Sequence, residues 1–159
     1  MRRVQSGLGA IAAIMILVIL AALSAAIISF STGQQLASAQ DVLASRAWLV
    51  ASAGTEGGLY RALKSNLCND TQTWTSADDP AFKVTVVCSS NDYNDGETVV
   101  GTPRYLRVFQ VVATACNSGA ASCPDDGASA GVGYVERQRI VVAYCTLKAD
   151  KSGCEDTEP

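Results

Sequence analysis

The chain has no histidine among its 159 residues. Histidine is the commonest general base at neutral pH, and both Ser-His-Asp and Cys-His catalytic sets require it. Its absence also removes the mixed cysteine–histidine ligand sets of zinc sites, and no two cysteines have C-x-x-C spacing. Glycine-rich phosphate-binding loops are absent as well. We therefore expect a protein that is not an enzyme and that holds neither a cofactor nor a metal.

Charge is missing from a long stretch near the N-terminus. No Asp, Glu, Lys or Arg lies between Arg3 and Asp41, and Leu8–Phe30 is almost entirely apolar. A helix needs roughly 20 apolar residues to cross a bilayer, so this segment is long enough to span one. Arg2 and Arg3 precede it, where the positive-inside rule places basic residues. The formal net charge is −3, with no other adjacent basic pair, so no nucleic-acid partner is predicted.

The chain has six cysteines, and all of them follow the apolar segment. An even number of cysteines in a small exported domain indicates a disulfide framework in an oxidising compartment, such as a periplasm or the cell exterior. Spacing alone leaves other pairings open. We favour pairs of sequence neighbours, because each closes a short polar loop at the end of an apolar segment: Cys68–Cys88, Cys116–Cys123 and Cys145–Cys154.

Three routes of N-terminal processing are compatible with the residues. A secretory signal peptide would be cut at Ala37-Ser38-Ala39, but its apolar region normally holds only about 7 to 15 residues. An uncleaved signal anchor would keep Arg2 and Arg3 in the cytoplasm. The third route, which the residues favour, removes Met1–Gly7 as a short basic leader and leaves the whole apolar helix on the mature protein.

A short basic leader that ends in glycine before a long apolar helix resembles a type IV prepilin. The resemblance implies a membrane prepilin peptidase that cleaves after Gly7 and methylates the new N-terminus, Leu8. The family usually has phenylalanine or methionine at that position and glutamate four residues later, where this chain has Leu8 and Ala12. That glutamate pairs with the N-terminus of a neighbouring subunit. Ala12 therefore implies a minor subunit rather than a major one.

The helix is expected to continue as an amphipathic segment over residues 31–67, with a kink rather than an end at Ser31-Thr32-Gly33. Gly54, Gly57 and Gly58 either weaken the helix locally or allow close approach of whatever packs there. Six residues recur at spacings that make one apolar face: Leu36, Leu43, Ala47, Val50, Leu59 and Leu63.

The same segment carries a second resemblance. Ser45-Arg46-Ala47-Trp48 is followed by Ala53-Gly54-Thr55-Glu56-Gly57-Gly58-Leu59-Tyr60-Arg61-Ala62-Leu63. The stretch resembles the one that follows the apolar segment in MshP-like minor pilins of mannose-sensitive haemagglutinin-type pili. We expect Trp48 and Tyr60 to anchor the helix in the core under a sheet, and Arg46 and Glu56 to be solvated.

Three strands are predicted after the helix, at residues 82–88, 105–114 and 134–144, from their alternation and their content of Val, Phe and Tyr. The first places Phe82, Val84, Val86 and Cys88 on one face. An antiparallel sheet packed on the second half of the helix follows, which gives an α+β fold. The resemblance implies that this fold is type IV pilin-like. The expected segments are a leader (1–7), a membrane helix (8–30), its continuation (31–67) and a disulfide-rich β domain (68–159).

Loops are expected at three places. Ser89–Glu97 gathers carboxylates that calcium accepts, but its spacing fails the EF-hand template, so it is read as an Asp95-Gly96 turn. Cys116–Gly131 is interpreted as an exposed connection that either contacts a partner or serves as a linker. The charged tail Lys148–Pro159 is expected to fray, apart from Cys154.

These observations predict a minor pilin, an assembly subunit of a type IV pilus or a related secretion filament. It would lie in the inner membrane with a periplasmic domain before assembly, and in the extracellular pilus afterwards. Its expected partners are other pilin subunits and the prepilin peptidase. Filament packing is expected to involve Leu8, Ala12, Ile16 and Leu20. The alternatives are a single-pass anchored periplasmic or cell-surface binding domain and, less favoured, a secreted domain released at Ala39.

Overall fold

A computed structural model describes residues 6–155, which form two compact units, one ending at Asp41 and the other beginning at Val42. We call them the N-terminal unit and the C-terminal unit. The expected leader, Met1–Gly7, therefore falls largely outside the described residues. The surroundings of Gly7 and the side chain of Leu8, on which the expected cleavage depends, lie outside them too.

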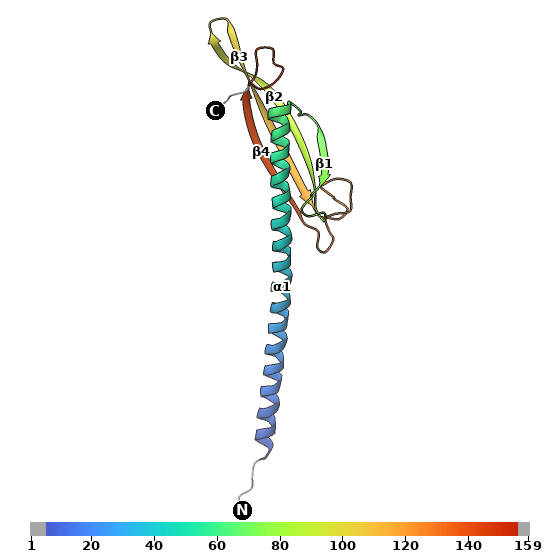
Figure 1. Cartoon of the computed structure of the whole chain (residues 1–159). Coiled ribbons are helices and arrows are strands. Elements are labelled where there is room, and N and C mark those ends of the chain that lie inside the picture. The colour runs from blue at the N-terminus through green and yellow to red at the C-terminus, as the bar shows by residue number, and fades with distance from the viewer. Residues whose placement is uncertain (1–5, 156–159) are drawn as a thin grey trace, which may run out of the picture. The chain divides into compact units, whose positions relative to one another are not determined.

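A single helix, α1, runs over Ser6–Ser65 and contributes to both units (Figure 1). Its residues are mostly strong helix formers, and the chain has no proline before Pro80. The helix continues through Gly33, because one glycine costs only about 1 kcal/mol relative to alanine. It ends where Asn66 takes a left-handed conformation, with φ at 52°, and the Leu67 amide donates to the Arg61 carbonyl at 3.0 Å.

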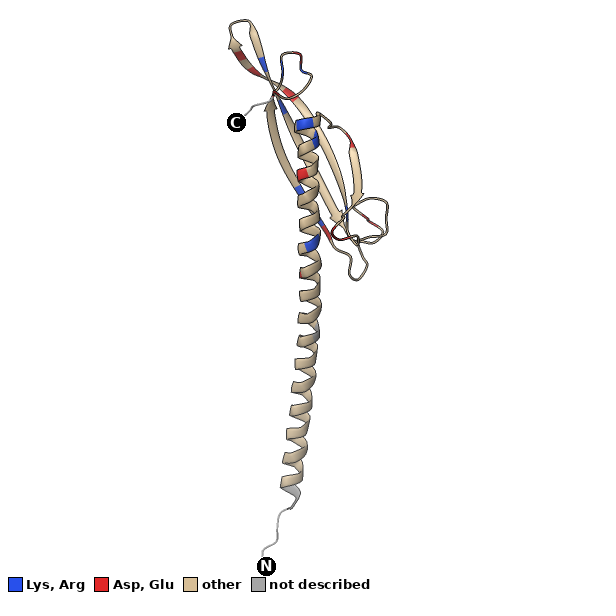
Figure 2. Ribbon diagram, in the orientation of Figure 1, with Lys and Arg blue, Asp and Glu red and all other residues tan. Residues whose placement is uncertain are grey.

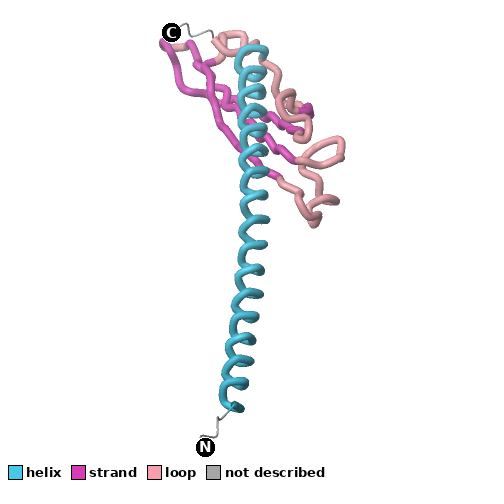
Figure 3. The backbone as a smooth tube through the Cα atoms, turned by 60° about the horizontal axis from the view of Figure 1, so that its bottom comes forward, coloured by secondary structure: helices cyan, strands magenta, loops and turns pink. Residues whose placement is uncertain are grey.

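Four strands form one antiparallel sheet in the order β1-β2-β3-β4. They are β1 Thr71–Thr75, β2 Lys83–Val99, β3 Thr102–Cys116 and β4 Glu136–Thr146. The C-terminal part of α1 lies along one face of this sheet, as Figures 1 and 3 show. The expected α+β fold, one long N-terminal helix that is apolar in its first half and packed on an antiparallel sheet, is thus confirmed.

Two expectations about the sheet need correction. Strand β1 was not among the three predicted strands: Thr-Gln-Thr-Trp-Thr has little apolar content, yet its backbone pairs along β2 from Thr71 to Thr75. Ser89–Glu97 is also strand rather than loop. It continues β2 opposite β3, and Gly96 lies at a register shift, while the turn is formed by Val100 and Gly101. Backbone pairing with β3 outweighs the local Asp-Gly turn signal.

The core lies between α1 and the sheet. Phe82, Val84, Val86 and Cys88 are buried on one side of the sheet, as the alternation predicted. They meet a helix face made of small residues: Ala47, Ala51, Gly54, Gly58 and Ala62. A Cβ at Gly54 would lie 2.7 Å from Cγ2 of Val84. Gly54 and Gly58 therefore allow close approach of the sheet.

The two helix aromatics are not core anchors, contrary to the sequence interpretation. Trp48 is 46% exposed and Tyr60 is 67% exposed. The helix lies so close to the sheet that its contact face holds alanine, glycine and valine, and large rings are displaced to the flanks. Trp48 instead lies beneath the guanidinium of Arg139, 5.9 Å from the ring centre.

Three disulfides fasten the C-terminal unit: Cys68–Cys88, Cys116–Cys123 and Cys145–Cys154. These are the sequence-neighbour pairs favoured above. The first ties the end of α1 to β2, the second closes the connection after β3, and the third holds the segment after β4.

Candidate assembly surfaces

The apolar part of α1 presents its side chains outward. Ile16 is 58% exposed and Leu20 is 54% exposed, and Ala12 is exposed too. Within residues 6–155, α1 is the one helix long and apolar enough to cross a membrane, and none of its most apolar stretch is buried. Figure 2 shows no charged residue along this part of the helix. Three of the four residues expected to pack in a filament, Ala12, Ile16 and Leu20, are therefore exposed on α1. The side chain of the fourth, Leu8, lies outside the described residues.

The polar side chains of this stretch are satisfied within the helix. The Ser24 hydroxyl donates to the Leu20 carbonyl at 2.8 Å, and the Ser29 hydroxyl donates to the Ala25 carbonyl at 3.1 Å. Serine can enter hydrocarbon at low cost when its hydroxyl is bonded to the preceding turn. The two serines are therefore compatible with a lipid or a dry protein environment.

A polar cluster joins the end of α1 to the sheet. Arg107 donates to both carboxylate oxygens of Asp92, at 2.6 and 2.8 Å, and to the Asn66 side-chain oxygen at 2.9 Å. Asn66 in turn donates to the Ser152 carbonyl at 2.7 Å. The hydrogen bond from Arg107 lowers the pKa of Asp92, and the same bond raises the pKa of Arg107.

The segment after β4 is held in place up to Glu155, whereas the sequence predicted a frayed tail. Leu147 forms a β-bridge with Cys154, and the Glu155 amide donates to the Thr146 carbonyl at 2.8 Å. The Lys151 ammonium lies 3.5 Å from the centre of the Tyr105 ring. Hydrogen bonds of Ser152 lower the pKa of Asp150. The disulfide and these local contacts together order the segment.

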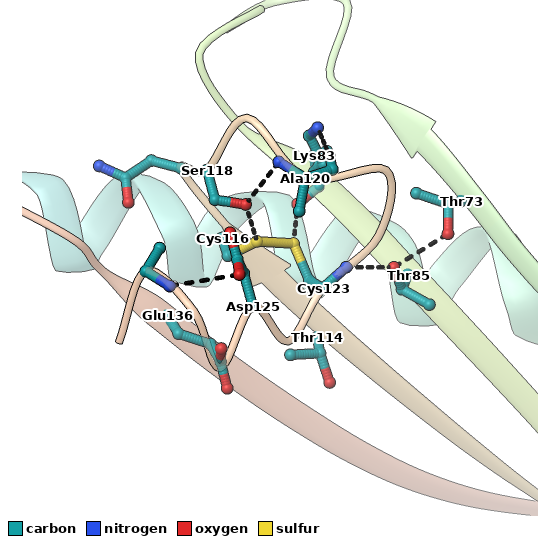
Figure 4. Close-up of a disulfide and its surroundings, with 12 residues drawn as sticks. Thr73, Lys83, Thr85, Thr114, Cys116, Ser118, Ala120, Cys123, Asp125 and Glu136 are labelled. Carbon is teal, nitrogen blue, oxygen red and sulfur yellow. Dashed lines mark hydrogen bonds between the residues drawn. A yellow bond between two sulfur atoms is a disulfide. The ribbon is translucent and has the colours of Figure 1, made fainter. Parts of the chain in front are cut away.

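The connection between β3 and β4 folds over the sheet face opposite α1 (Figure 4). The Cys123 amide donates to the Thr85 hydroxyl at 2.8 Å, and that hydroxyl also contacts the Thr73 hydroxyl at 2.9 Å. Lys83 donates to the Ala120 carbonyl. This part of the connection is therefore bonded to β2 rather than being a solvated linker.

Farther along the same connection, Tyr134 ties the loop to β4. Its hydroxyl donates to the Glu136 carboxylate and accepts from the Asp125 amide at 3.2 Å. Partial burial raises the pKa of the Tyr134 phenol, and the bond to Glu136 raises it further. A shielded phenol in contact with a carboxylate stays protonated, so it serves as a fixed donor that holds the loop.

Two of the three carboxylates of Ser89–Glu97 are engaged in ion pairs. Asp92 is bound by Arg107, and Asp95 pairs with Arg104 across the β2–β3 hairpin. Across residues 6–155, no three His, Cys, Asp or Glu side chains come together as a metal site. The guanidinium groups of Arg107 and Arg104 therefore neutralise the carboxylates of Asp92 and Asp95.

Two exposed valines at the β2–β3 hairpin were missed by the sequence reasoning. Val100 is 99% exposed and Val99 is 69% exposed. They stand at the turn with Gly101, which has a φ of 87° and whose amide donates to Glu97 at 3.0 Å. The signal in the sequence is the Val-Val-Gly triplet between two polar stretches. We call Thr98–Thr102 the hairpin tip.

An open apolar groove lies between α1 and the connection from β1 to β2. Its volume is about 190 Å³, and its walls are formed by Leu49, Val50 and Ala53. Asp78 and Asp79 stand at its rim, where Arg46 lies 3.7 Å from Asp79. We call this the α1–β1 groove. The Arg46 side chain is 57% exposed and Glu56 is exposed, so both are largely solvated in the single chain.

An apolar helix that becomes the core helix of a disulfide-bonded, four-stranded antiparallel sheet is a pilin-like architecture. The apolar helix suggests a membrane anchor or a signal, and the disulfides suggest a domain outside the cytoplasm. Comparison of the chain with models of known families, with characterised proteins and with solved structures finds no match.

Proposed function

We propose that this protein is a minor pilin, a structural subunit of a type IV pilus or a related secretion filament. Before assembly it is held in the inner membrane by residues 8–30 with its disulfide-bonded domain in the periplasm. In the filament its partners are other pilin subunits. Its role is assembly rather than catalysis, in keeping with a chain that has no histidine.

The observation that carries this proposal is the helical continuity of α1 from Ser6 to Ser65. One helix is both the apolar segment and the core element of the sheet domain. An ordinary membrane anchor has no need of this, because a flexible linker between span and domain serves equally well. Shared use of one helix suits a subunit whose apolar segment packs against neighbouring subunits while the rest of the same helix carries the sheet domain.

Transfer from lipid to a filament exchanges one apolar environment for another. It therefore depends on close packing of helices rather than on a gain in hydrophobic burial. Small residues allow such packing, and the apolar segment is rich in them: Gly9, Ala10, Ala12, Ala13, Ala21, Ala22, Ser24, Ala25 and Ala26. Ile16 and Leu20 are exposed on this segment and would fill the spaces between neighbouring helices.

Recovery of the chain in sheared surface filaments tests the proposal. The protein is produced with a tag at its C-terminus in a host that assembles type IV pili, and in the same host without its assembly ATPase. We expect the chain in the filament fraction of the first host and in the membrane fraction of the second. A chain that stays in the membrane in both hosts would point instead to an anchored domain outside any filament.

A further inference from the structure

We propose that the free edge of β4 binds an extended strand of a different protein, which adds to the sheet as a further strand antiparallel to β4. The incoming strand carries uncharged apolar side chains at alternate positions. The choice of a different protein over a second copy rests on the proposed filament function, whereas the strand addition itself does not. Figure 1 shows β4 at one edge of the sheet.

The backbone of β4 alternates between the sheet and its open edge. Just after the strand, the Leu147 amide donates to the Tyr105 carbonyl at 2.9 Å. Just before it, the Val135 carbonyl accepts from the Asn117 amide at 3.3 Å. In an antiparallel pair, every second residue bonds to the neighbouring strand. The odd-numbered residues of β4 therefore bond to β3, and the N–H and C=O groups of its even-numbered residues point away from β3.

These outward groups have partners at both ends of β4 but not between them. The Glu136 carbonyl accepts from the Arg137 guanidinium at 3.0 Å, and the Thr146 carbonyl accepts from the Glu155 amide at 2.8 Å. The bond from Glu155 lies next to an antiparallel bridge, so the edge already accepts a segment of that direction. In the described part of the chain, no other strand or loop pairs with the outward groups of the four residues between: Gln138, Ile140, Val142 and Tyr144.

Strand β4 lacks the features that normally protect a sheet edge from further pairing. It pairs with β3 over all 11 of its residues without a register shift, whereas the pairing of β2 with β3 has two. It contains no proline or lysine, and no charge from Ile140 to Thr146. The opposite edge, β1, has only 5 residues. Because short strands, bulges, proline and lysine are the usual means of preventing edge pairing, β4 is the edge left open to a partner.

The sheet face beside this edge is apolar and uncharged. Val141 packs against the core, so its neighbours Ile140 and Val142 lie on the face opposite α1, where they are 53% and 65% exposed. Tyr144, on the same face, is 73% exposed. The cross-strand neighbours of these three residues continue the face, and none of them is charged: Val112, Gln110, Val108, Val87, Ser89 and Asn91. Since directly opposite residues of a strand pair lie on one face, the incoming strand presents apolar side chains here.

A cavity on the α1 side of the edge leaves room for the other side chains of the incoming strand. Its volume is about 330 Å³, and it lies between Leu63 on α1 and Cys145 on β4. The lining combines the apolar Leu63 with the polar Thr146 and Glu155. Small polar residues that alternate with the apolar ones therefore suit this second face of the strand.

The direction of β4 argues against a second copy as the partner. Trp48 lies beneath Arg139, and farther along both elements Leu63 and Cys145 line one cavity, so β4 runs in the same direction as this part of α1. Two copies joined antiparallel through β4 have these helices in opposite directions. A filament that repeats one contact keeps one direction for all its subunits.

The other edge of a second copy, β1, does not match the apolar face either. On that side of the sheet β1 carries only threonine, at Thr71, Thr73 and Thr75. The neighbours of a minor pilin are other pilin subunits, and we therefore assign the incoming strand to a subunit of different sequence.

Peptide binding followed by amide hydrogen exchange tests the strand addition. The full chain in detergent, with its three disulfides intact, is mixed with a synthetic peptide of alternating threonine and valine with lysines at both ends. Without peptide, we expect the Ile140 and Val142 amides to exchange at least about tenfold faster than the Val141 and Ala143 amides, which bond to β3. Saturating peptide should slow the Ile140 and Val142 amides by about tenfold or more. Unchanged exchange of these two amides overturns the proposal.

Two N-methylated forms of the peptide are the matched controls. Peptide residues directly opposite Ile140 and Val142 bond to β4 and share their face, so the peptide valines supply the N–H groups. Methylation of the valine nitrogens should weaken binding by about tenfold or more, and methylation of the threonine nitrogens should leave it within about threefold. Equal binding by the two forms overturns the pairing.

The oligomeric state of the chain in detergent tests the choice of partner. Without peptide, we expect a monomer in which the Val142 amide exchanges fast. A dimer in which this amide is protected overturns the assignment to a different protein. These measurements use no filament, so they decide the contact whether or not the chain is recovered in sheared filaments, which tests the proposed function separately.

Discussion

Gly58 on α1 lies directly against Val111 on β3, so close that a Cβ atom at Gly58 would come within 2.6 Å of Cγ1 of Val111. A side chain at this point has to push the helix and the sheet apart. We expect Gly58→Ala to lower the free energy of unfolding by about 1 to 3 kcal/mol, the usual cost of overpacking a core.

Urea unfolding of the full chain in detergent, with the disulfides intact, measures this change. Gly57→Ala is the matched control, because its Cβ would meet only the Trp74 ring at 3.7 Å, an ordinary contact. That variant should be neutral or more stable by about 0.5 to 1 kcal/mol, since alanine favours a helix over glycine. Equal effects of the two substitutions would contradict the close approach.

The disulfides should differ in their contribution to stability. Cys68 and Cys88 are 20 residues apart, and Cys116 and Cys123 are 7 apart. In the chain-entropy account, the disulfide that closes the longer loop lowers the entropy of the unfolded chain more. It therefore stabilises the folded state by about 1 kcal/mol more than the disulfide that closes the shorter loop. Replacing both cysteines of the first pair by alanine should therefore lower the unfolding free energy by about 1 kcal/mol more than the same change in the second. Urea unfolding of the two double variants gives the comparison, and a larger loss from the shorter loop would count against it.

The Asp92–Arg107 pair predicts a pH dependence of stability. Asp92 has its pKa lowered from the usual 3.8 in the folded state, so its contribution is present above that value and is lost as pH falls through the lowered pKa. We expect Asp92→Asn to cost about 1 kcal/mol of unfolding free energy at pH 7, discounted for partial exposure, and little near pH 2.

Unfolding curves of the two proteins across pH 2 to 7 should thus converge at acid pH. Arg107→Lys keeps the positive charge but loses the fork that reaches both oxygens of Asp92, so its loss at pH 7 should be smaller than that of Asp92→Asn. A constant difference between wild type and Asp92→Asn over the whole range would exclude an ionic origin.

A charge in the apolar part of α1 should impair membrane insertion. Arginine near the centre of a spanning helix costs about 2.5 to 3.5 kcal/mol on insertion scales, so Leu20→Arg should reduce the fraction of chain that resists alkaline carbonate extraction. Gln35→Arg, outside the predicted span, should leave that fraction unchanged. If carbonate extracts both variants equally, residues 8–30 do not form the membrane segment.

The fold was largely predictable because its strongest signals are long and periodic. Three patterns extend over enough residues to outweigh the conformational preferences of single residues. They are the apolar segment, the α-helical spacing of Ala47 and Val50, and the alternation from Phe82 to Cys88. The cysteine pairs follow the same logic, since neighbours along the chain close loops at strand ends.

The features that were missed depend on contacts with distant residues. Trp48 was expected in the core because aromatic rings bury most area, but the glycines at 54 and 58 bring the sheet too close for a ring. The polar strand β1 has no apolar alternation and forms because β2 offers it an edge. The exposed Val99 and Val100 show no periodic pattern, and only the pairing of β2 with β3 places them at a projecting turn.

The central claim is most directly tested by the intact mass and N-terminal residue of the protein extracted from membranes of a host that expresses a prepilin peptidase. The account predicts a chain that begins at Leu8, carries one methyl group on its N-terminus and contains three disulfides. A chain that begins at Met1 would indicate an uncleaved anchor, and one that begins at Gln40 a secreted domain. Either result would contradict the assignment of this protein as a pilin.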